Sequence, residues 1–149
     1  MRTRTKIISG VVAAIAAAGA LSLTPLASAS STASGGDCYG SEVIRCVTTG
    51  SAYGYTWAWG SVKDADGGTN YSVSVSNATI ERSIDGEWVH LAHSNDYDGW
   101  WGVREEAETQ NYRCYGRSVR AKVLVKWKRV GSTHVSKEWL YGPALRCAS

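Results

Sequence analysis

Paired aspartates are the first residues in this sequence whose types and spacing could do chemistry. The stretches 64–67 and 96–99 both read Asp-x-Asp-Gly, which alternates carboxylates before a glycine as calcium-binding loops do. Neither stretch has the third ligand before the glycine or the bidentate glutamate further on that an EF-hand requires. Aspartate and glycine also favour turns, so we predict acidic turns between strands and no metal site.

Histidines and glutamates form the next candidates. His90 and His93 have H-x-x-H spacing, but side chains alternate faces along a strand, so the two imidazoles should point apart and not share a metal. No histidine is accompanied by a nucleophile motif such as G-x-S-x-G. The glutamates between 105 and 108 could act in pairs on a glycoside, yet a domain of about 120 residues offers little depth for a cleft. We predict a protein that is not an enzyme and needs no cofactor.

The aromatic residues are unusual, with seven Trp, eight Tyr and no Phe. Buried Trp and Tyr need hydrogen-bond partners, so both types commonly sit half exposed. In the stretch 53–60, YGYTWAWG, every second residue is aromatic and the intervening residues are small. We predict that Tyr53, Tyr55, Trp57 and Trp59 line the core, with the small residues packed beneath another segment. A solvent-facing row that binds a ligand is the alternative.

Adjacent aromatics occur at Trp100 and Trp101. Neighbouring residues on a strand point to opposite faces, so at most one of the pair can enter a one-sided core. We predict that one of them is exposed, and both are candidate binding residues.

A basic stripe is expected along the strand 118–129, SVRAKVLVKWKR. Alternation places Val119, Ala121, Val123, Val125 and Trp127 on one face, which is the predicted core side. The other face carries the candidate binding residues Arg120, Lys122, Lys126 and Lys128, with Leu124 among them. Such a stripe is either a solvated outer face or a contact surface for a partner.

The elements that must position these residues follow a leader. Residues 1–29 have basic residues, an apolar run and a small-residue cleavage site at Ala27-Ser28-Ala29, which predicts a signal peptide and secretion. No later segment is long enough to span a bilayer. Residues 30–37, SSTASGGD, predict a flexible arm, and residues 38–149 a single β domain.

Charge is distributed unevenly along the chain. The three basic residues of the leader account for the whole formal net charge of +3, so overall charge does not favour nucleic-acid binding. From Ser30 to Thr109 twelve acids face four bases, and from Gln110 onward nine bases face the single acid Glu138. Acidic and basic strands could neutralise each other across one sheet, or one face of the protein could be basic and steer a partner.

Short alternating segments separated by turns predict an all-β fold, an antiparallel β-sandwich or barrel of six to eight short strands. A change of phase within 71–83 predicts a β-bulge, and Asp85-Gly86 predicts a type I′ hairpin turn. Four cysteines indicate two disulfides. Three pairings are possible, and we favour Cys38–Cys46 with Cys114–Cys147 because each then closes a local loop.

The leader, the absence of Phe and the disulfides resemble those of small secreted actinobacterial proteins. In size, leader, short Ser/Gly arm and Trp-rich β domain from Cys38 to Cys147, the chain resembles the small adaptor subunits of umbrella-type toxin particles. The resemblance is one of organisation, and no site residue is carried over from it. It implies a protein-interaction module whose partner is another secreted protein.

Two alternatives remain open. The first is a carbohydrate-binding module in which Trp57, Trp59, Trp100 or Trp101 stacks on sugar rings. The second is an enzyme inhibitor or killer toxin that acts through one rigid loop such as Asn95 to Trp101.

Overall fold

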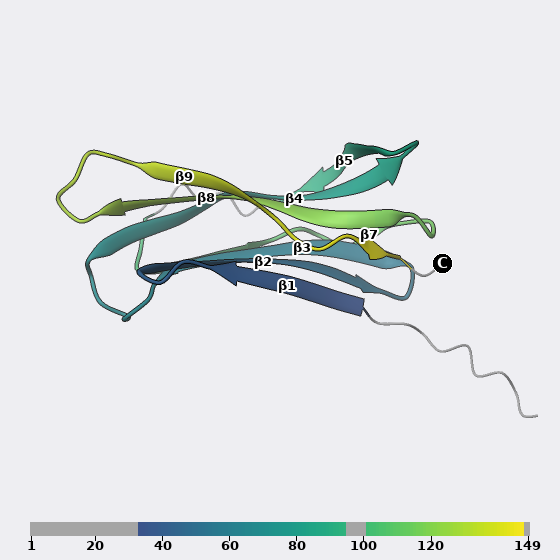
Figure 1. Ribbon diagram of the computed structural model, residues 1–149. Coiled ribbons are helices and arrows are strands. Elements are labelled where there is room, and N and C mark those ends of the chain that lie inside the picture. The colour runs from purple at the N-terminus through teal and green to yellow at the C-terminus, as the bar shows by residue number, and fades with distance from the viewer. Residues whose placement is uncertain (1–32, 95–100, 148–149) are drawn as a thin grey trace, which may run out of the picture.

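Two antiparallel β-sheets packed face to face make up the protein. The computed structural model describes residues 33–94 and 101–147, which contain no helix (Figure 1). The strands are β1 (Ala33–Tyr39), β2 (Val43–Ala52), β3 (Tyr55–Asp64), β4 (Tyr71–Ile84), β5 (Glu87–His93), β6 (Arg104–Glu108), β7 (Tyr112–Arg113), β8 (Ser118–Arg129), β9 (Ser136–Tyr141) and β10 (Leu145–Arg146). The predicted all-β sandwich is confirmed. The strands outnumber the six to eight expected because β7 and β10 are two residues long, too short for an alternating pattern.

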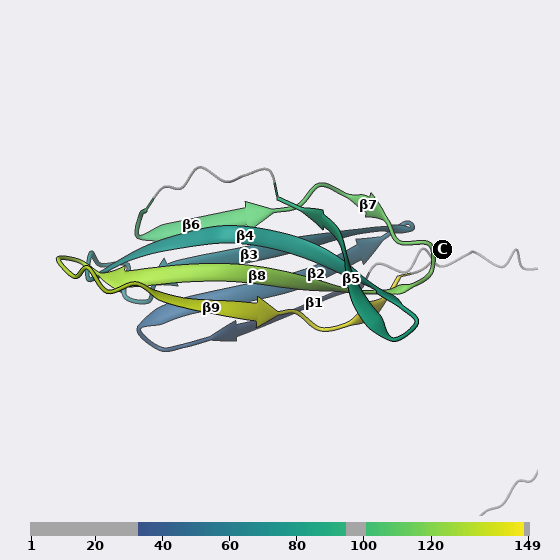
Figure 2. The ribbon, with the colours of Figure 1, turned by 90° about the horizontal axis from the view of Figure 1, so that it is seen from above.

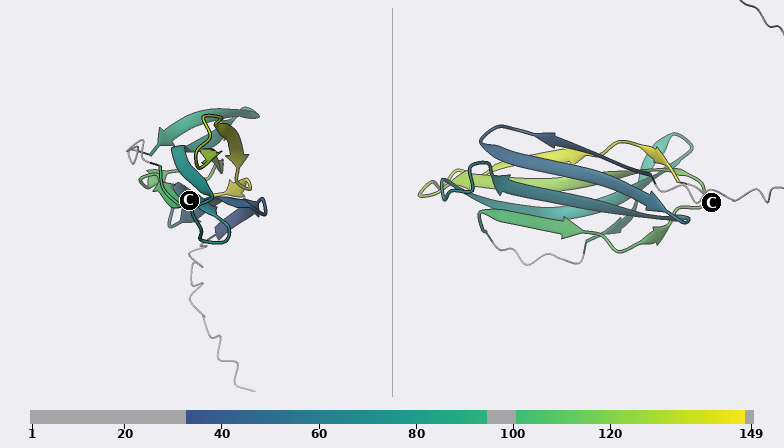
Figure 3. Two further views of the ribbon diagram at one scale, coloured as in Figure 1. Left: turned by 90° about the vertical axis from the view of Figure 1, so that its left-hand side faces the viewer. Right: turned by 90° about the horizontal axis from the view of Figure 1, so that it is seen from below.

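The sheets have simple orders. One runs β1-β2-β3-β6, with β7 also pairing β3, and the other runs β10-β8-β4-β5, with β9 also pairing β8. We call them the β3 sheet and the β8 sheet. Figure 2 looks onto the β8 sheet, with β4 and β9 on either side of β8, and the right-hand view of Figure 3 looks onto the β3 sheet. Each sheet therefore has one face toward the core and one toward solvent.

The core is built from small and β-branched residues. Val119, Ala121, Val123 and Val125 of β8 are fully buried, as the alternation in that strand predicts. Facing them, β3 turns its small side chains inward, and a Cβ added at Gly60 would lie 2.4 Å from Cγ1 of Val123. The sheets approach so closely here that only glycine fits.

The prediction that Tyr53, Tyr55, Trp57 and Trp59 line the core is therefore wrong. Thr56 and Ala58 between them are completely buried, whereas Tyr55 is 38% exposed and both tryptophans are partly exposed. The valines of β8 fill the space between the sheets and leave no room for rings opposite. The small residues do pack beneath another segment, and that segment is the opposing sheet.

The hairpin turn and the bulge that the sequence predicts are both present. Asp85 and Gly86 both have positive φ, which is the predicted type I′ geometry. Tyr53-Gly54, which connects β2 to β3, has the same sign of φ at both positions, so Tyr53 belongs to a turn. The predicted bulge in β4 is present, because the register with β8 shifts between Val75 and Asn77.

The N-terminal segment differs from the flexible arm predicted over 30–37. From Ala33 onward it is part of β1, and residues 33–37 pair in register with Ser51 to Val47 of β2. The small side chains that suggest disorder are accommodated here because they let the strand lie close to its neighbours. Gly35, for example, packs so near Pro143 that an added Cβ would lie 2.7 Å from Cγ of that ring.

Two disulfides close the structure. Cys38 is bonded to Cys46 directly across β1 and β2, and Cys114 to Cys147 across 33 residues of sequence. Disulfides of this kind are compatible with an extracellular protein. Within residues 33–94 and 101–147, no helix has the length and hydropathy needed to cross a membrane.

Candidate functional site

The basic stripe of β8 lies on the outer face of the β8 sheet. Arg120 and Lys122 flank one carboxylate there, that of Glu81 on β4, a buried residue. The Nε and Nη2 atoms of Arg120 both lie 2.8 Å from Oε2 of Glu81, and Nζ of Lys122 lies 3.6 Å from Oε1. These ionic contacts fix the two cations on the surface of the sheet.

Aromatic rings enclose the same two cations. The guanidinium carbon of Arg120 lies 4.3 Å from the ring centroid of Trp88 and 4.7 Å from that of Tyr141. Nζ of Lys122 lies 4.7 Å from the centroid of Trp139. Cation–π contacts of this length are attractive, so β5, β8 and β9 together present an ordered patch of rings and positive charge. Trp139 and Tyr141 are 42% and 45% exposed.

A groove crosses the outer face beside this patch. Two adjoining cavities of about 390 Å³ each share Asn77, His93 and Trp139. One of them also contains Lys122 and the other Lys126. We call the combined depression the groove. Its floor lies on β4 and β8, and His93 of β5 and Trp139 of β9 stand on its two sides.

The two histidines lie together beside the groove, and the prediction that they point to opposite faces is wrong. Their ring centroids are 5.6 Å apart. The register of β5 with β4 shifts so that Ala92 pairs with Ile80 and His90 with Glu81, which leaves Leu91 as the extra residue of a bulge. A bulge reverses the alternation. In the part of the chain that the structure describes, no three His, Cys, Asp or Glu residues are grouped to hold a metal ion.

Within residues 33–94 and 101–147, the lysines toward the other end of the stripe have no ionic partner. Lys126 pairs directly across the strands with Lys137 of β9. Among the described residues, no carboxylate lies within 4.0 Å of Lys126, Lys128 or Lys137. Like charges opposite each other destabilise a sheet. Of the carboxylates that the structure describes, only Glu81 lies within 4.0 Å of a cation of the stripe. The whole outer face of the β8 sheet therefore keeps positive charge that Glu81 does not neutralise. We call it the basic face; it comprises Arg120, Lys122, Lys126, Lys128 and Lys137, the rings that contact them and the side chains that line the groove.

Only one member of the tryptophan pair can be placed. Trp101 is partly exposed, and Nζ of Lys128 lies 4.7 Å from its ring centroid. Trp101 therefore extends the basic face at its edge. Trp100 lies outside the described residues, and so does the second Asp-x-Asp-Gly stretch, so neither prediction is tested.

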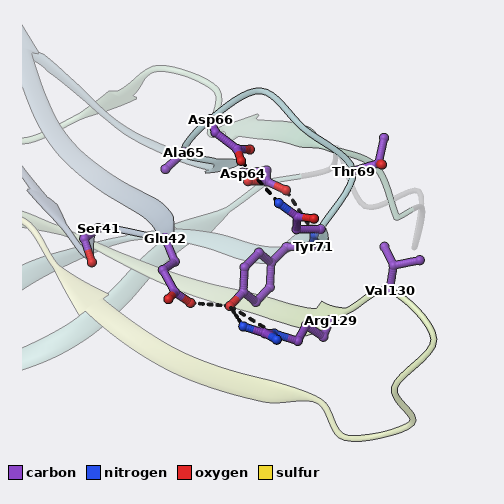
Figure 4. A pocket seen from close by; sticks show the side chains of 10 residues that line it. Ser41, Glu42, Asp64, Ala65, Asp66, Thr69, Tyr71, Arg129 and Val130 are labelled. Atoms are coloured by element: carbon purple, nitrogen blue, oxygen red, sulfur yellow. Dashed lines mark hydrogen bonds between the residues drawn. The ribbon is translucent and has the colours of Figure 1, made fainter.

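A cavity of about 730 Å³ lies at one end of the sandwich around the first Asp-x-Asp-Gly stretch (Figure 4). The buried Asp64 carboxylate accepts the backbone N–H of Tyr71 at 2.9 Å. Asp66 accepts the N–H of Gly68 at 2.8 Å, and this bond, more than any other, lowers the pKa of Asp66. The stretch forms the acidic turn that the sequence predicts.

Three further side chains of this cavity, those of Glu42, Tyr71 and Arg129, also bind one another. The Tyr71 hydroxyl donates a hydrogen bond to the Glu42 carboxylate. It accepts hydrogen bonds from Nε and Nη2 of Arg129, each at 3.4 Å. This hydroxyl raises the pKa of Arg129 further. These contacts tie together the loops that surround the cavity.

Several residues of the basic face were missed in the sequence. The sequence of β9 alternates a serine, a glutamate and a leucine with Lys137, Trp139 and Tyr141. This alternation could have predicted that the three side chains share one face. Trp88 and the histidines could not be assigned in this way, because their orientation depends on the bulge in β5.

No protein-family model matches the chain, and no curated protein matches it at a significant level.

Proposed function

We propose that this protein is a secreted, non-enzymatic interaction module whose basic face docks an acidic segment of another secreted protein. In this role it would be an adaptor or subunit of an extracellular complex such as a toxin particle. One observation carries the proposal: Lys126 and Lys137 are held opposite each other with no carboxylate within 4.0 Å among the described residues. An anionic segment that binds beside these two lysines would relieve the repulsion between them, and this relief would add to the free energy of binding.

The neighbouring side chains support a protein as the partner. Trp, Tyr and Arg dominate the energetics of protein interfaces, and Trp88, Tyr141 and Arg120 are already stacked in fixed positions. Preorganised side chains lose little entropy on binding. The groove adds Leu124 and Trp139 as apolar contacts beside Lys126, which suits a segment that alternates acidic and apolar residues.

An affinity purification of the tagged mature protein from its native culture supernatant tests the proposal. Mass spectrometry should identify a stoichiometric protein partner, and the double variant Lys126→Glu/Lys137→Glu should lose it. Lys63→Glu is the matched control, because Lys63 is exposed on the outer face of the β3 sheet. Recovery of no partner, or equal loss with Lys63→Glu, would contradict the proposal.

A further inference from the structure

The outer face of the β3 sheet, on the opposite side of the sandwich from the basic face, carries a row of aromatic rings. Tyr55, Trp57 and Trp59 occupy alternate positions of β3, with their side chains on the outer face of the β3 sheet because the residues between them are buried. Side chains two positions apart on a strand are separated by about 6.8 Å. The three rings therefore form one line along the strand.

The backbone beneath Trp57 lets its ring lie flat on the sheet. Gly50 of β2 is directly opposite Trp57, and an added Cβ there would lie 2.1 Å from Cε2 and 2.4 Å from Cζ2 of the indole. The ring thus occupies the space of the missing side chain and buries Gly50. Because one face of the indole is against the backbone, its exposed area belongs to the opposite face and the edges.

The neighbours of the row are polar or very small. Glu108 is directly opposite Trp59 and is exposed. Arg113 is opposite Tyr55, with its guanidinium carbon 5.4 Å from the ring centroid. On the β2 side, Thr48 and Gly50 face the two tryptophans. The row therefore combines π-faces with one carboxylate and one guanidinium, which balance in charge.

This arrangement fits the chemistry of a sugar chain. A pyranose ring has a face of C–H groups that packs on the electron-rich face of an aromatic ring. Its hydroxyl groups donate to carboxylates and accept from guanidinium groups. A protein interface core would favour buried apolar neighbours, and an anionic ligand would be repelled by Glu108. Because the three rings follow one strand, an elongated ligand lying along that strand fits better than a single small molecule.

We propose that Tyr55, Trp57 and Trp59, with Glu108 and Arg113, form a binding platform for a neutral oligosaccharide. The site goes beyond the proposed function and is independent of it, because it lies on the other sheet. Stacking on Trp57 and Trp59 supplies most of the affinity, and Glu108 orients the sugar hydroxyls.

Retention of the mature protein on insoluble chitin, cellulose, xylan, mannan and purified bacterial cell wall tests the platform, together with a glycan array. The wild-type protein should bind at least one of these probes. Trp57→Ala and Trp59→Ala should each weaken that binding about tenfold or more, which corresponds to the loss of a substantial contact. Trp139→Ala is the matched control, because this tryptophan is exposed on the opposite face, and it should bind like the wild type.

Circular dichroism and thermal unfolding would verify that each variant is folded, and Glu108→Gln provides a variant that keeps all the rings. Binding to none of the polysaccharides and no array glycan would overturn the inference. Equal weakening by Trp139→Ala would also overturn it. Loss of a protein partner or of self-association in Trp57→Ala, without any sugar binding by the wild type, would assign the row to a protein contact instead.

Discussion

At the scale of single residues, Gly60 decides which face of β3 enters the core. A side chain at this position would collide with Val123, since an added Cβ would lie 2.4 Å from Cγ1 and 2.8 Å from Cγ2. We expect Gly60→Ala to lower the free energy of unfolding by about 1–3 kcal/mol, as overpacking does. Removing the valine methyl groups in Gly60→Ala/Val123→Ala should recover part of this loss relative to the sum of the single variants. Urea unfolding of all four proteins measures the coupling, and strict additivity would show that the contact is not the cause.

Glu81 is the second decisive residue, because it alone neutralises Arg120 and Lys122 among the described residues. Its side chain is 9% exposed, and those of the two cations are 24% and 29% exposed. Glu81→Gln keeps the shape but removes the charge, and we expect a loss of about 1.5–3 kcal/mol, typical of charged hydrogen bonds. Glu106→Gln is the control. Glu106 pairs with Arg104 at the surface, where the two side chains are 39% and 66% exposed, and such pairs contribute about 0–1 kcal/mol. Equal effects in chemical denaturation would contradict the role of Glu81.

At the scale of elements, β1 makes the N-terminal segment part of the fold. Residues 33–37 pair with β2, so deleting them would leave the corresponding edge of β2 unpaired. We expect a mature chain that begins at Cys38 to be less stable than one that begins at Ala33 by about 2–3 kcal/mol, given that each net backbone hydrogen bond contributes about 0.5–1.5 kcal/mol. The difference in urea midpoint between the two chains measures this. Identical midpoints would mean that residues 33–37 do not stabilise the fold and behave as the flexible arm that the sequence predicts.

The faces of individual strands were only partly predictable from the sequence. Alternation in β8 identified its buried face correctly, because valines and lysines differ strongly in their cost of burial. The alternation in β3 identified two faces but assigned them wrongly, since rings and small residues can both be buried, and the choice depends on the valines of the opposing sheet. The bulge at Leu91 brings His90 and His93 to one face, and a single extra residue of this kind has no signature in the local pattern. The basic stripe was therefore predictable, whereas the groove and the aromatic platform required the register between strands.

At the scale of the whole molecule, the sandwich presents two chemically different surfaces that face away from each other. The basic face carries lysines without ionic partners among the described residues. The aromatic row on the β3 sheet has balanced charges at Glu108 and Arg113. A core of buried residues separates the two surfaces. One molecule could therefore hold a protein on one side and a sugar chain on the other.

Ionic strength should distinguish the two surfaces. The Debye length falls from about 10 Å at 0.1 M salt to about 3 Å at 1 M, so salt screens the attraction between an acidic segment and the basic face. Between 50 and 500 mM NaCl, we expect the association rate of the purified partner to fall about tenfold or more. Sugar binding depends on stacking and on neutral hydroxyl groups, so its affinity should change less than about twofold. Surface plasmon resonance measures both on the same immobilised protein. If the two interactions lost affinity in parallel, charge would be the common cause, and the aromatic row would not be a separate site.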